Sequence, residues 1–211
     1  ANWSLERVPT SDDYTVFPYT GSAYSIEVDG DYEVRAFHID EGSNANLGTI
    51  TLTGSGSVLS SGLQENYVRG KRKLVLDGAS VKLTGNYLMT YSPITVKNGS
   101  KFETVDRALT LWKTKPELHV EAGGTVIVDG ELRNYARAVV NVNGGSLSVK
   151  KMLNYGGSTG GMYISVTAGS LTAEDVSVTN GSSLAVSGGT FKATGTIGLV
   201  DWEDVALDLT G

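Results

Sequence analysis

The amino-acid sequence predicts an all-β protein built as a single-stranded parallel β-helix, or β-solenoid, in which short strands stack coil upon coil. Three observations predict this class. A strand–corner–strand phrase recurs about every 20–24 residues, 27 glycines are available for corners, and no stretch has a helical hydrophobic period. We expect right-handed coils, about seven to eight of them, giving a shaft roughly 35–40 Å long.

The clearest copy of the phrase is residues 140–149. Side chains in a strand point alternately to opposite sides, so Val140, Val142, Leu147 and Val149 can all face one interior. The glycines at 144–145 lie between the two alternating segments and permit a bend that a Cβ atom would hinder. The phrase therefore predicts two strands joined at a corner.

Copies of this phrase occupy residues 50–58, 74–83, 94–102, 118–128 and 164–171. Aligning them, with the copy at 140–149, places one apolar residue of each copy in a single row, with spacings of 24, 20, 24, 22 and 24: Leu52, Leu76, Val96, Val120, Val142 and Val166. We expect these residues to stack inside the solenoid. The next position then places Asp77, Lys97 and Glu121 in an outer row of alternating charge, and Lys82 next to Glu103 repeats the pattern.

The pattern divides the chain into three parts. Residues 1–35 are expected to form an N-terminal aromatic cap and the first strands, because a terminal coil must cover its open apolar end. The coils follow over residues 36–198. Residues 199–211 alternate apolar and acidic side chains, which fits either a closing cap or a strand offered to another subunit. The aromatic residues crowded near the start are Trp3, Tyr14, Phe17, Tyr19 and Tyr24.

The opening of the chain resembles the start of many bacterial and phage β-helix proteins. The likeness lies in Asn2-Trp3-Ser4, Pro9, Asp12-Asp13 and residues 28–34, together with the repeat pattern. Autotransporter-like passenger domains are the best-known of these proteins. In phage virions, β-helical proteins serve as capsid decoration (cement) proteins, spikes and fibres, usually as trimers. The resemblance implies a structural role and no particular chemistry.

A second pattern is an Asn-Tyr pair that recurs at intervals of one or two coils. We predict a structural ladder in which Asn side chains hydrogen-bond along the axis and Tyr rings pack offset, and a sugar-binding aromatic strip is the alternative. The ladder residues are Asn66, Tyr67, Asn86, Tyr87, Asn134, Tyr135, Asn154 and Tyr155.

Other residues are candidates for contact with a partner. The basic segment at 69–73 is either a solvated loop or a contact with an acidic surface. Tryptophans of the cap, of the excursion at 105–117 and of the tail are further candidates. The complete set is Trp3, Arg69, Lys71, Arg72, Trp112 and Trp202.

Composition argues against several functions. The formal net charge of −6 argues against a nucleic-acid binder. No apolar stretch of 18 residues exists, which argues against a membrane span. The chain has no Cys and only two His, His38 and His119, which argues against a metal site. We therefore expect no membrane span, no metal and no cofactor. The carboxylate pairs available for glycan cleavage are Glu103 with Asp106 and Asp129 with Glu131. We expect no second coil to supply either pair with matching acids or a basic partner, and we therefore expect no enzyme activity.

The start at Ala1 fits either a cleaved signal peptide or a removed initiator Met, and the second is favoured because the repeat fills the chain. The first hypothesis is therefore a non-enzymatic structural protein of a virion surface, most specifically a homotrimeric phage capsid decoration protein that contacts the major capsid or another virion protein. The alternatives are a secreted adhesin or autotransporter-like fragment at the cell surface that binds host or glycan, and a polysaccharide lyase or hydrolase.

Overall fold

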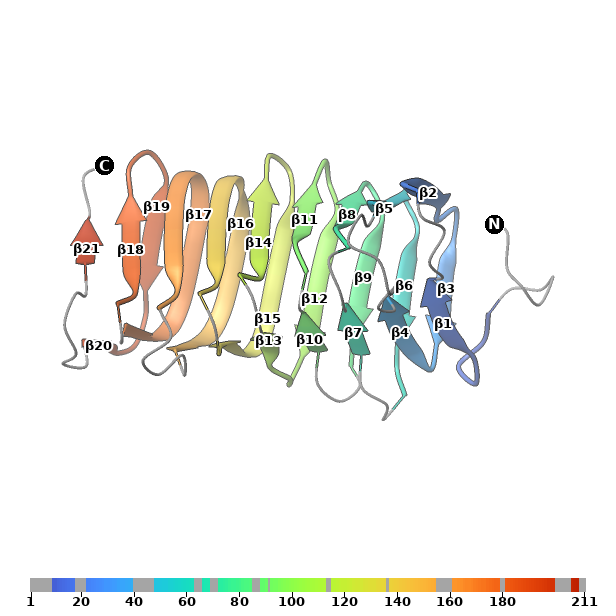
Figure 1. The fold of residues 1–211 in the computed structure, drawn as a ribbon, viewed down its shortest axis with the longest axis horizontal. Helices are drawn as coiled ribbons and strands as arrows, with labels where there is room; N and C mark the ends of the chain where they lie inside the picture. The colour runs from blue at the N-terminus through green and yellow to red at the C-terminus, as the bar shows by residue number, and fades with distance from the viewer. Residues whose placement is uncertain are drawn as a thin grey trace.

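The structure is a computed structural model that describes residues 9–17, 22–39, 48–62, 66–68, 72–84, 88–90, 92–112, 115–135, 137–154, 161–178, 181–199 and 206–208. Within these residues the regular structure is all strand, and every pairing between strands is parallel except for one isolated bridge. The strands stack along one axis as a β-solenoid, which confirms the predicted class (Figure 1).

The coils have three sides, which we call faces 1, 2 and 3. Each face is a ladder of parallel strands in which a strand pairs with the equivalent strand of the coil before and the coil after. Face 1 consists of β2 (Tyr24–Glu27), β5 (Ile50–Thr53), β8 (Leu74–Asp77), β11 (Ile94–Lys97), β14 (Glu117–Glu121), the first parts of β16 (Val139–Asn154) and β17 (Tyr163–Val178), β18 (Ser183–Val186) and β21 (Ala206–Asp208).

Face 2 follows face 1 in each coil. It consists of β3 (Asp31–Val34), β6 (Ser57–Ser60), β9 (Ser80–Leu83), β12 (Lys101–Val105), the first part of β15 (Thr125–Asn134), the middle parts of β16 and β17, and β19 (Thr190–Ala193).

Face 3 completes the coil. It consists of β1 (Tyr14–Phe17), β4 (Ala36–Ile39), β7 (Asn66–Val68), β10 (Leu88–Thr90), β13 (Leu109–Leu111), and the last parts of β15, β16 and β17, followed by β20 (Ile197–Leu199). The strands β15, β16 and β17 run without interruption around one or two corners.

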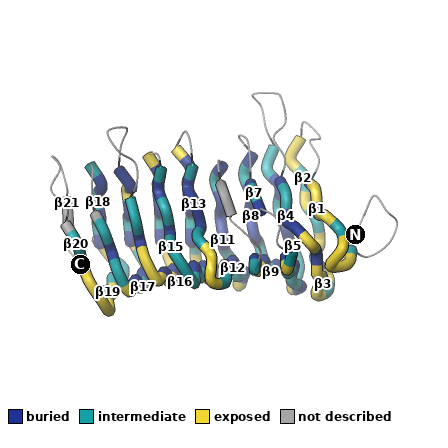
Figure 2. The backbone as a smooth tube through the Cα atoms, turned by 90° about the horizontal axis from the view of Figure 1, so that it is seen from below, coloured by how far each residue is buried: buried dark blue, intermediate teal, exposed yellow. Residues whose placement is uncertain are grey.

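The predicted register of face 1 is confirmed. Each member of the apolar row pairs with the next, and all six side chains are fully buried: Leu52, Leu76, Val96, Val120, Val142 and Val166. The row extends to Ile26 at one end and Val186 at the other. Buried residues recur through the described coils between Phe17 and Val186 (Figure 2).

The corner between faces 1 and 2 needs glycine for two separate reasons. Gly54 and Gly78 have φ values of 99° and 96°, a left-handed conformation that residues with a Cβ rarely adopt. A Cβ on Gly54 would also lie 2.4 Å from the Val28 carbonyl oxygen in the coil before it. The glycine corners expected from the sequence are thus set by backbone conformation and by close stacking.

The two ends bear on the expected cap and tail. At the start, Phe17 is buried in the core, whereas Tyr14 is 44% exposed, and Trp3 and Tyr19 lie outside the described residues. The aromatic cap therefore stays a prediction.

At the end, β21 pairs in parallel with β18 of the same chain, with Leu207 opposite Leu184. The described part of the tail thus extends face 1 of its own chain.

Candidate functional site

The outer sides of faces 1 and 2 carry ion pairs between neighbouring coils. Lys97 Nζ lies 3.3 Å from the Asp77 carboxylate, and Asn98 Nδ2 donates to the same carboxylate at 2.7 Å. The Asn98 hydrogen bond is the main reason that the pKa of Asp77 lies below its usual value, and Lys97 adds to it. The predicted charge row is thus present between Asp77 and Lys97, where it joins adjacent coils.

On face 2, Glu103 is held between two lysines. Its carboxylate lies 2.6 Å from Lys101 Nζ and 3.3 Å from Lys82 Nζ, and its side chain is 17% exposed. The hydrogen bond from Lys101 is the largest contribution that lowers the pKa of Glu103, followed by the charges of both lysines. The expected neighbour pair of Lys82 and Glu103 is confirmed.

Face 3 differs, because its outer side carries aromatic rings at its N-terminal end. His38 stacks on Tyr67 with ring centroids 4.1 Å apart and an interplanar angle of 13°, and Tyr14 tilts against His38 at 5.6 Å. The Arg35 guanidinium lies 5.2 Å from the centroid of the Tyr14 ring. Tyr14 is 44% exposed and Val16 beside it is 49% exposed. These five residues form what we call the N-terminal aromatic surface.

A second aromatic pair lies farther along the same face. Trp112 and Tyr135 contact each other with ring centroids 4.7 Å apart and an interplanar angle of 51°, and both are half-buried. They follow paired strands, because Leu111 pairs with Asn134 and the Tyr135 backbone N–H donates to the Leu111 carbonyl. Trp112, expected as a partner contact, and Tyr135, expected as a ladder member, therefore contact each other.

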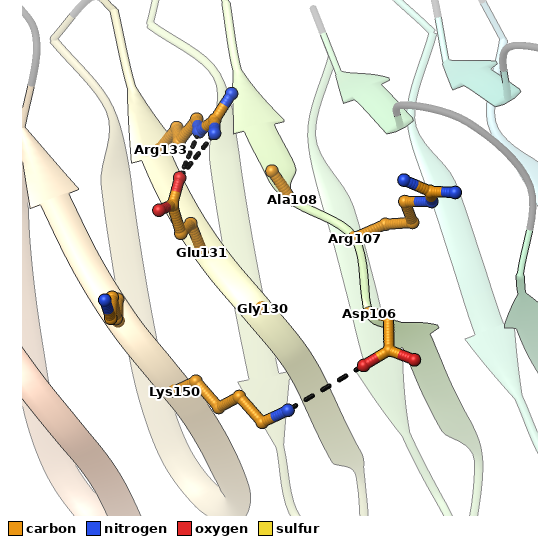
Figure 3. Close-up of a pocket in the computed structure, with 8 residues that line it drawn as sticks. Asp106, Arg107, Ala108, Gly130, Glu131, Arg133 and Lys150 are labelled. Atoms are coloured by element: carbon orange, nitrogen blue, oxygen red, sulfur yellow. Dashed lines mark hydrogen bonds and ion pairs between the residues drawn. The ribbon is translucent and has the colours of Figure 1, made fainter.

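A charged hollow of about 330 Å³ lies at the corner between faces 2 and 3 (Figure 3). Its walls come from three consecutive coils, and its lining residues are Asp106, Arg107, Ala108, Gly130, Glu131, Arg133, Lys150 and Lys151. We call this site the corner hollow. A Cβ on Gly130 would lie 2.4 Å from the Arg107 carbonyl oxygen, so the backbones of adjacent coils are closely packed at its floor.

Two strong ion pairs lie in or beside the corner hollow. Arg133 binds Glu131 through Nε and Nη2, both at 2.5 Å. Lys150 Nζ lies 2.5 Å from Asp129 and 3.9 Å from Asp106. The Lys150 hydrogen bond lowers the pKa of Asp129, and the same contact raises the pKa of Lys150. The expectation that no second coil supplies a basic partner is therefore wrong, since Lys150 lies one coil from Asp129 and two coils from Asp106.

The predicted Asn-Tyr ladder is divided between two different rows. Asn134 Nδ2 donates to Asn154 Oδ1 at 2.7 Å, so these two residues stack as expected. Asn66 lies in another row, where it pairs with Leu88 of the next coil. Its Oδ1 accepts hydrogen bonds from the Phe37 backbone N–H at 2.8 Å and from Ser60 Oγ at 2.6 Å. A single ladder through Asn66 and Asn134 is therefore not formed.

Arg72 differs from its expected role as a solvated or partner-contacting residue. Its side chain is 2% exposed, and Nη1 lies 3.4 Å from the Phe17 carbonyl oxygen. Arg72 also interacts with Tyr24, whose pKa is raised by burial and lowered to a smaller extent by Arg72. Arg72 thus binds the Phe17 backbone and the Tyr24 side chain. Because it is buried, it is not available to an outside partner.

The remaining predicted site residues lie outside the part of the chain whose side chains the structure describes: Trp3, Arg69, Lys71, Asn86, Tyr87, Tyr155 and Trp202. In the part that it does describe, no three His, Cys, Asp or Glu side chains are grouped as metal ligands would be. A search of the same residues for a helix with the length and apolarity of a membrane span finds none. Comparisons with protein-family models, with curated protein sequences and with solved structures give no match to this chain.

Proposed function

We propose that this chain is a non-enzymatic structural protein of a virion surface, most specifically a homotrimeric phage capsid decoration protein that binds the major capsid or another virion protein. The main support is the continuous register of face 1, in which six buried residues from successive coils stack in one row. A shaft with such a core resists bending and suits a mechanical role. The proposal includes about seven to eight right-handed coils, because parallel crossovers are nearly always right-handed.

The state of the carboxylates favours a structural role over hydrolysis. A general acid that works near neutral pH needs a raised pKa. The pKa values of Glu103 and Asp129 are instead lowered by the lysines that bind them. Glu131 is bound twice by Arg133. Glu103 and Asp129 are thus held as anions in ion pairs with lysines of neighbouring coils, Lys82 and Lys150.

The N-terminal aromatic surface is our candidate for the contact between subunits or with the capsid. Tyr14 and Val16 are exposed on the outer side of β1, and Tyr67 and His38 stack beside them. Exposed aromatic and apolar side chains of this kind are enriched at protein interfaces. The same residues also favour the adhesin alternative, because flat aromatic rings can pack against sugar rings.

The test combines location and assembly. Immunogold labelling with an antibody against the chain is applied to particles and cells from the source culture, and label on virions is the expected result. Static light scattering of the purified chain should give three times the mass of one chain, and Tyr14→Ser with Val16→Ser should lower it. Label on the cell envelope would replace the virion proposal by the adhesin. Depolymerisation of an acidic polysaccharide that Asp106→Asn abolishes would replace it by the enzyme.

A further inference from the structure

We propose that the corner hollow and the neighbouring Trp112–Tyr135 pair together bind a carboxylate-bearing saccharide, with the carboxylate at Arg107 and Lys151 and a sugar ring against the aromatic pair. This site lies at the corner of faces 2 and 3 and extends onto face 3, several coils from the N-terminal aromatic surface. The inference does not depend on the virion proposal.

Charge is the first reason. The lining of the corner hollow holds four cations, Arg107, Arg133, Lys150 and Lys151, against two carboxylates, although the chain as a whole has a formal net charge of −6. Asp129 and Glu174 beside the lining also act on Lys150, so the attraction for an anionic group comes from the cations that no carboxylate binds.

The cations fall into two classes. Arg133 and Lys150 are bound at 2.5 Å to Glu131 and Asp129. Among the ion pairs of the described residues, none involves Arg107 or Lys151, and both side chains are exposed. The first two cations thus hold the walls of the hollow in place, while the second two retain hydrogen-bond donors for a ligand.

Lys151 pairs in register with Glu131 on one side and Asp175 on the other, but no ion pair of the described residues joins it to either carboxylate. Glu131 is bound by Arg133, and Asp175 Oδ1 accepts the Thr196 backbone N–H at 2.9 Å. The ammonium group of Lys151 therefore remains a donor to an incoming carboxylate.

Acceptors for hydroxyl groups are also present. Asp106 lines the hollow and has a 79% exposed side chain. Its nearest cation, Lys150, is 3.9 Å away and closer to Asp129. An exposed carboxylate beside free cations can accept hydrogen bonds from sugar hydroxyls while the cations bind the acid group.

Trp112 and Tyr135 directly follow β13 and β15, the strands that lead away from the corner hollow. Side chains two apart in a strand share one side and are separated by about 7 Å. Arg133 and Tyr135 are related in this way, because Asn134 between them is fully buried. A ligand that reaches from the corner hollow along face 3 therefore meets Trp112 and Tyr135 next. An acidic saccharide carries acid groups, hydroxyl groups and flat apolar ring faces. These match the cations, the exposed carboxylate and the aromatic rings of this site.

The experiment measures binding of three probes to the whole chain by titration calorimetry. Hexagalacturonate is the acidic saccharide, its fully methyl-esterified form keeps the rings and loses the charge, and hexaglutamate keeps the charge and lacks the rings. We expect the acid saccharide to bind at least about tenfold more tightly than either of the others, and more weakly as salt is added.

Variants test the assignment of residues. Arg107→Gln and Lys151→Gln should each weaken binding of the acid saccharide by about fivefold to tenfold and leave binding of the ester unchanged. Trp112→Leu should weaken both saccharides to a similar degree. Lys192→Gln, an exposed cation on β19, is the matched control and should change nothing. Circular dichroism and thermal unfolding verify that each variant is folded.

Several results would overturn the inference. Equal binding of the acid and the ester would mean that the cations are not used. Hexaglutamate binding as tightly as the acid saccharide would assign the hollow to an acidic protein segment instead. A folded Arg107→Gln variant with unchanged affinity, or no binding of the acid saccharide at millimolar concentration, would also contradict the proposal.

Discussion

At the scale of single residues, substitutions at two corner glycines distinguish the cost of close packing from the cost of backbone strain. Gly99 has a φ of 83°, and a Cβ added there would have no atom within 4 Å. A Cβ added to Gly124 would lie 2.1 Å from the Val96 carbonyl oxygen. Gly99→Ala should therefore lower the free energy of unfolding by about 1–2 kcal/mol, from strain alone. Gly124→Ala should lower it by more, because two coils must move apart. Urea denaturation of both variants measures the difference, and equal losses would contradict it.

A buried chain of polar groups gives a second prediction. Asn134 donates to Asn154 Oδ1, and Asn154 Nδ2 donates to Ser182 Oγ at 2.9 Å, which also accepts the Met162 backbone N–H. Asn154→Ala removes the acceptor opposite the fully buried Asn134, so it should cost about 1–3 kcal/mol of unfolding free energy.

The matched control for Asn154→Ala is Asn143→Ala, because Asn143 is exposed and accepts only a long bond of 3.2 Å from Thr167 Oγ1 among the contacts described for it. Chemical denaturation of both variants should show a clear loss for the first and a change within about 0.5 kcal/mol for the second. If Asn143→Ala lowered the free energy of unfolding as much as Asn154→Ala, burial would not explain the stabilisation by the Asn134–Asn154 contact.

The Asn-Tyr pattern shows where residue-level prediction succeeds. The spacing of 20 between Asn134 and Asn154 equals one coil, and the two side chains stack. Asn66 was assigned to the same row by spacing, yet it pairs with Leu88 because loops of unequal length separate the strands of face 3. The stacking of His38 on Tyr67 was missed for the same reason, since 29 residues separate them.

At the scale of strands, the ion pairs of face 2 make stability depend on pH. The pKa of Glu103 in the folded chain lies below its usual value, mainly because of Lys101. A group with a lowered folded pKa stabilises the fold above its unfolded pKa of about 4.3. This contribution is lost as the pH falls through the lowered value.

Glu103→Gln should therefore reduce the free energy of unfolding at pH 7 by about 0.5–1 kcal/mol. The variant and the parent chain should converge only at a pH below the lowered folded pKa of Glu103, where the parent carboxyl is protonated as well. Denaturation midpoints between pH 7 and pH 2 measure both effects. The control is Glu174→Gln at an exposed position. A difference between parent and Glu103→Gln that persists unchanged at low pH would show that charge is not its cause.

Face 1 was the most predictable ladder, because a short glycine corner follows each of its strands and keeps the alternation in phase. Val120, Val142 and Val166 could be aligned from the sequence alone. The corner hollow could not be predicted, since it brings together residues from three coils whose relative rotation depends on how the corner at Gly130 packs.

At the scale of the whole molecule, the three faces share one interior and differ outside. Faces 1 and 2 carry ion pairs such as Asp77–Lys97 and Lys82–Glu103, which join one coil to the next. Face 3 carries the aromatic pairs and the corner hollow. Face 3 and its corner with face 2 thus carry both regions for which contacts are proposed.

Because each coil packs only on its neighbours, damage to one coil should spread along the axis by contact and fade with distance. Val142→Ala deletes two methyl groups from a fully buried position in β16, between Val120 and Val166. We expect it to cost about 2 kcal/mol locally. Native-state hydrogen exchange should show faster amides in β14 and β17 than in β3 or β6, which lie several coils away. Ser148→Ala, at an exposed position of the same strand, should leave the pattern unchanged. An equal acceleration from β3 to β19 would mean that the shaft unfolds as a single cooperative unit, and that stacking between nearest neighbours does not describe its stability.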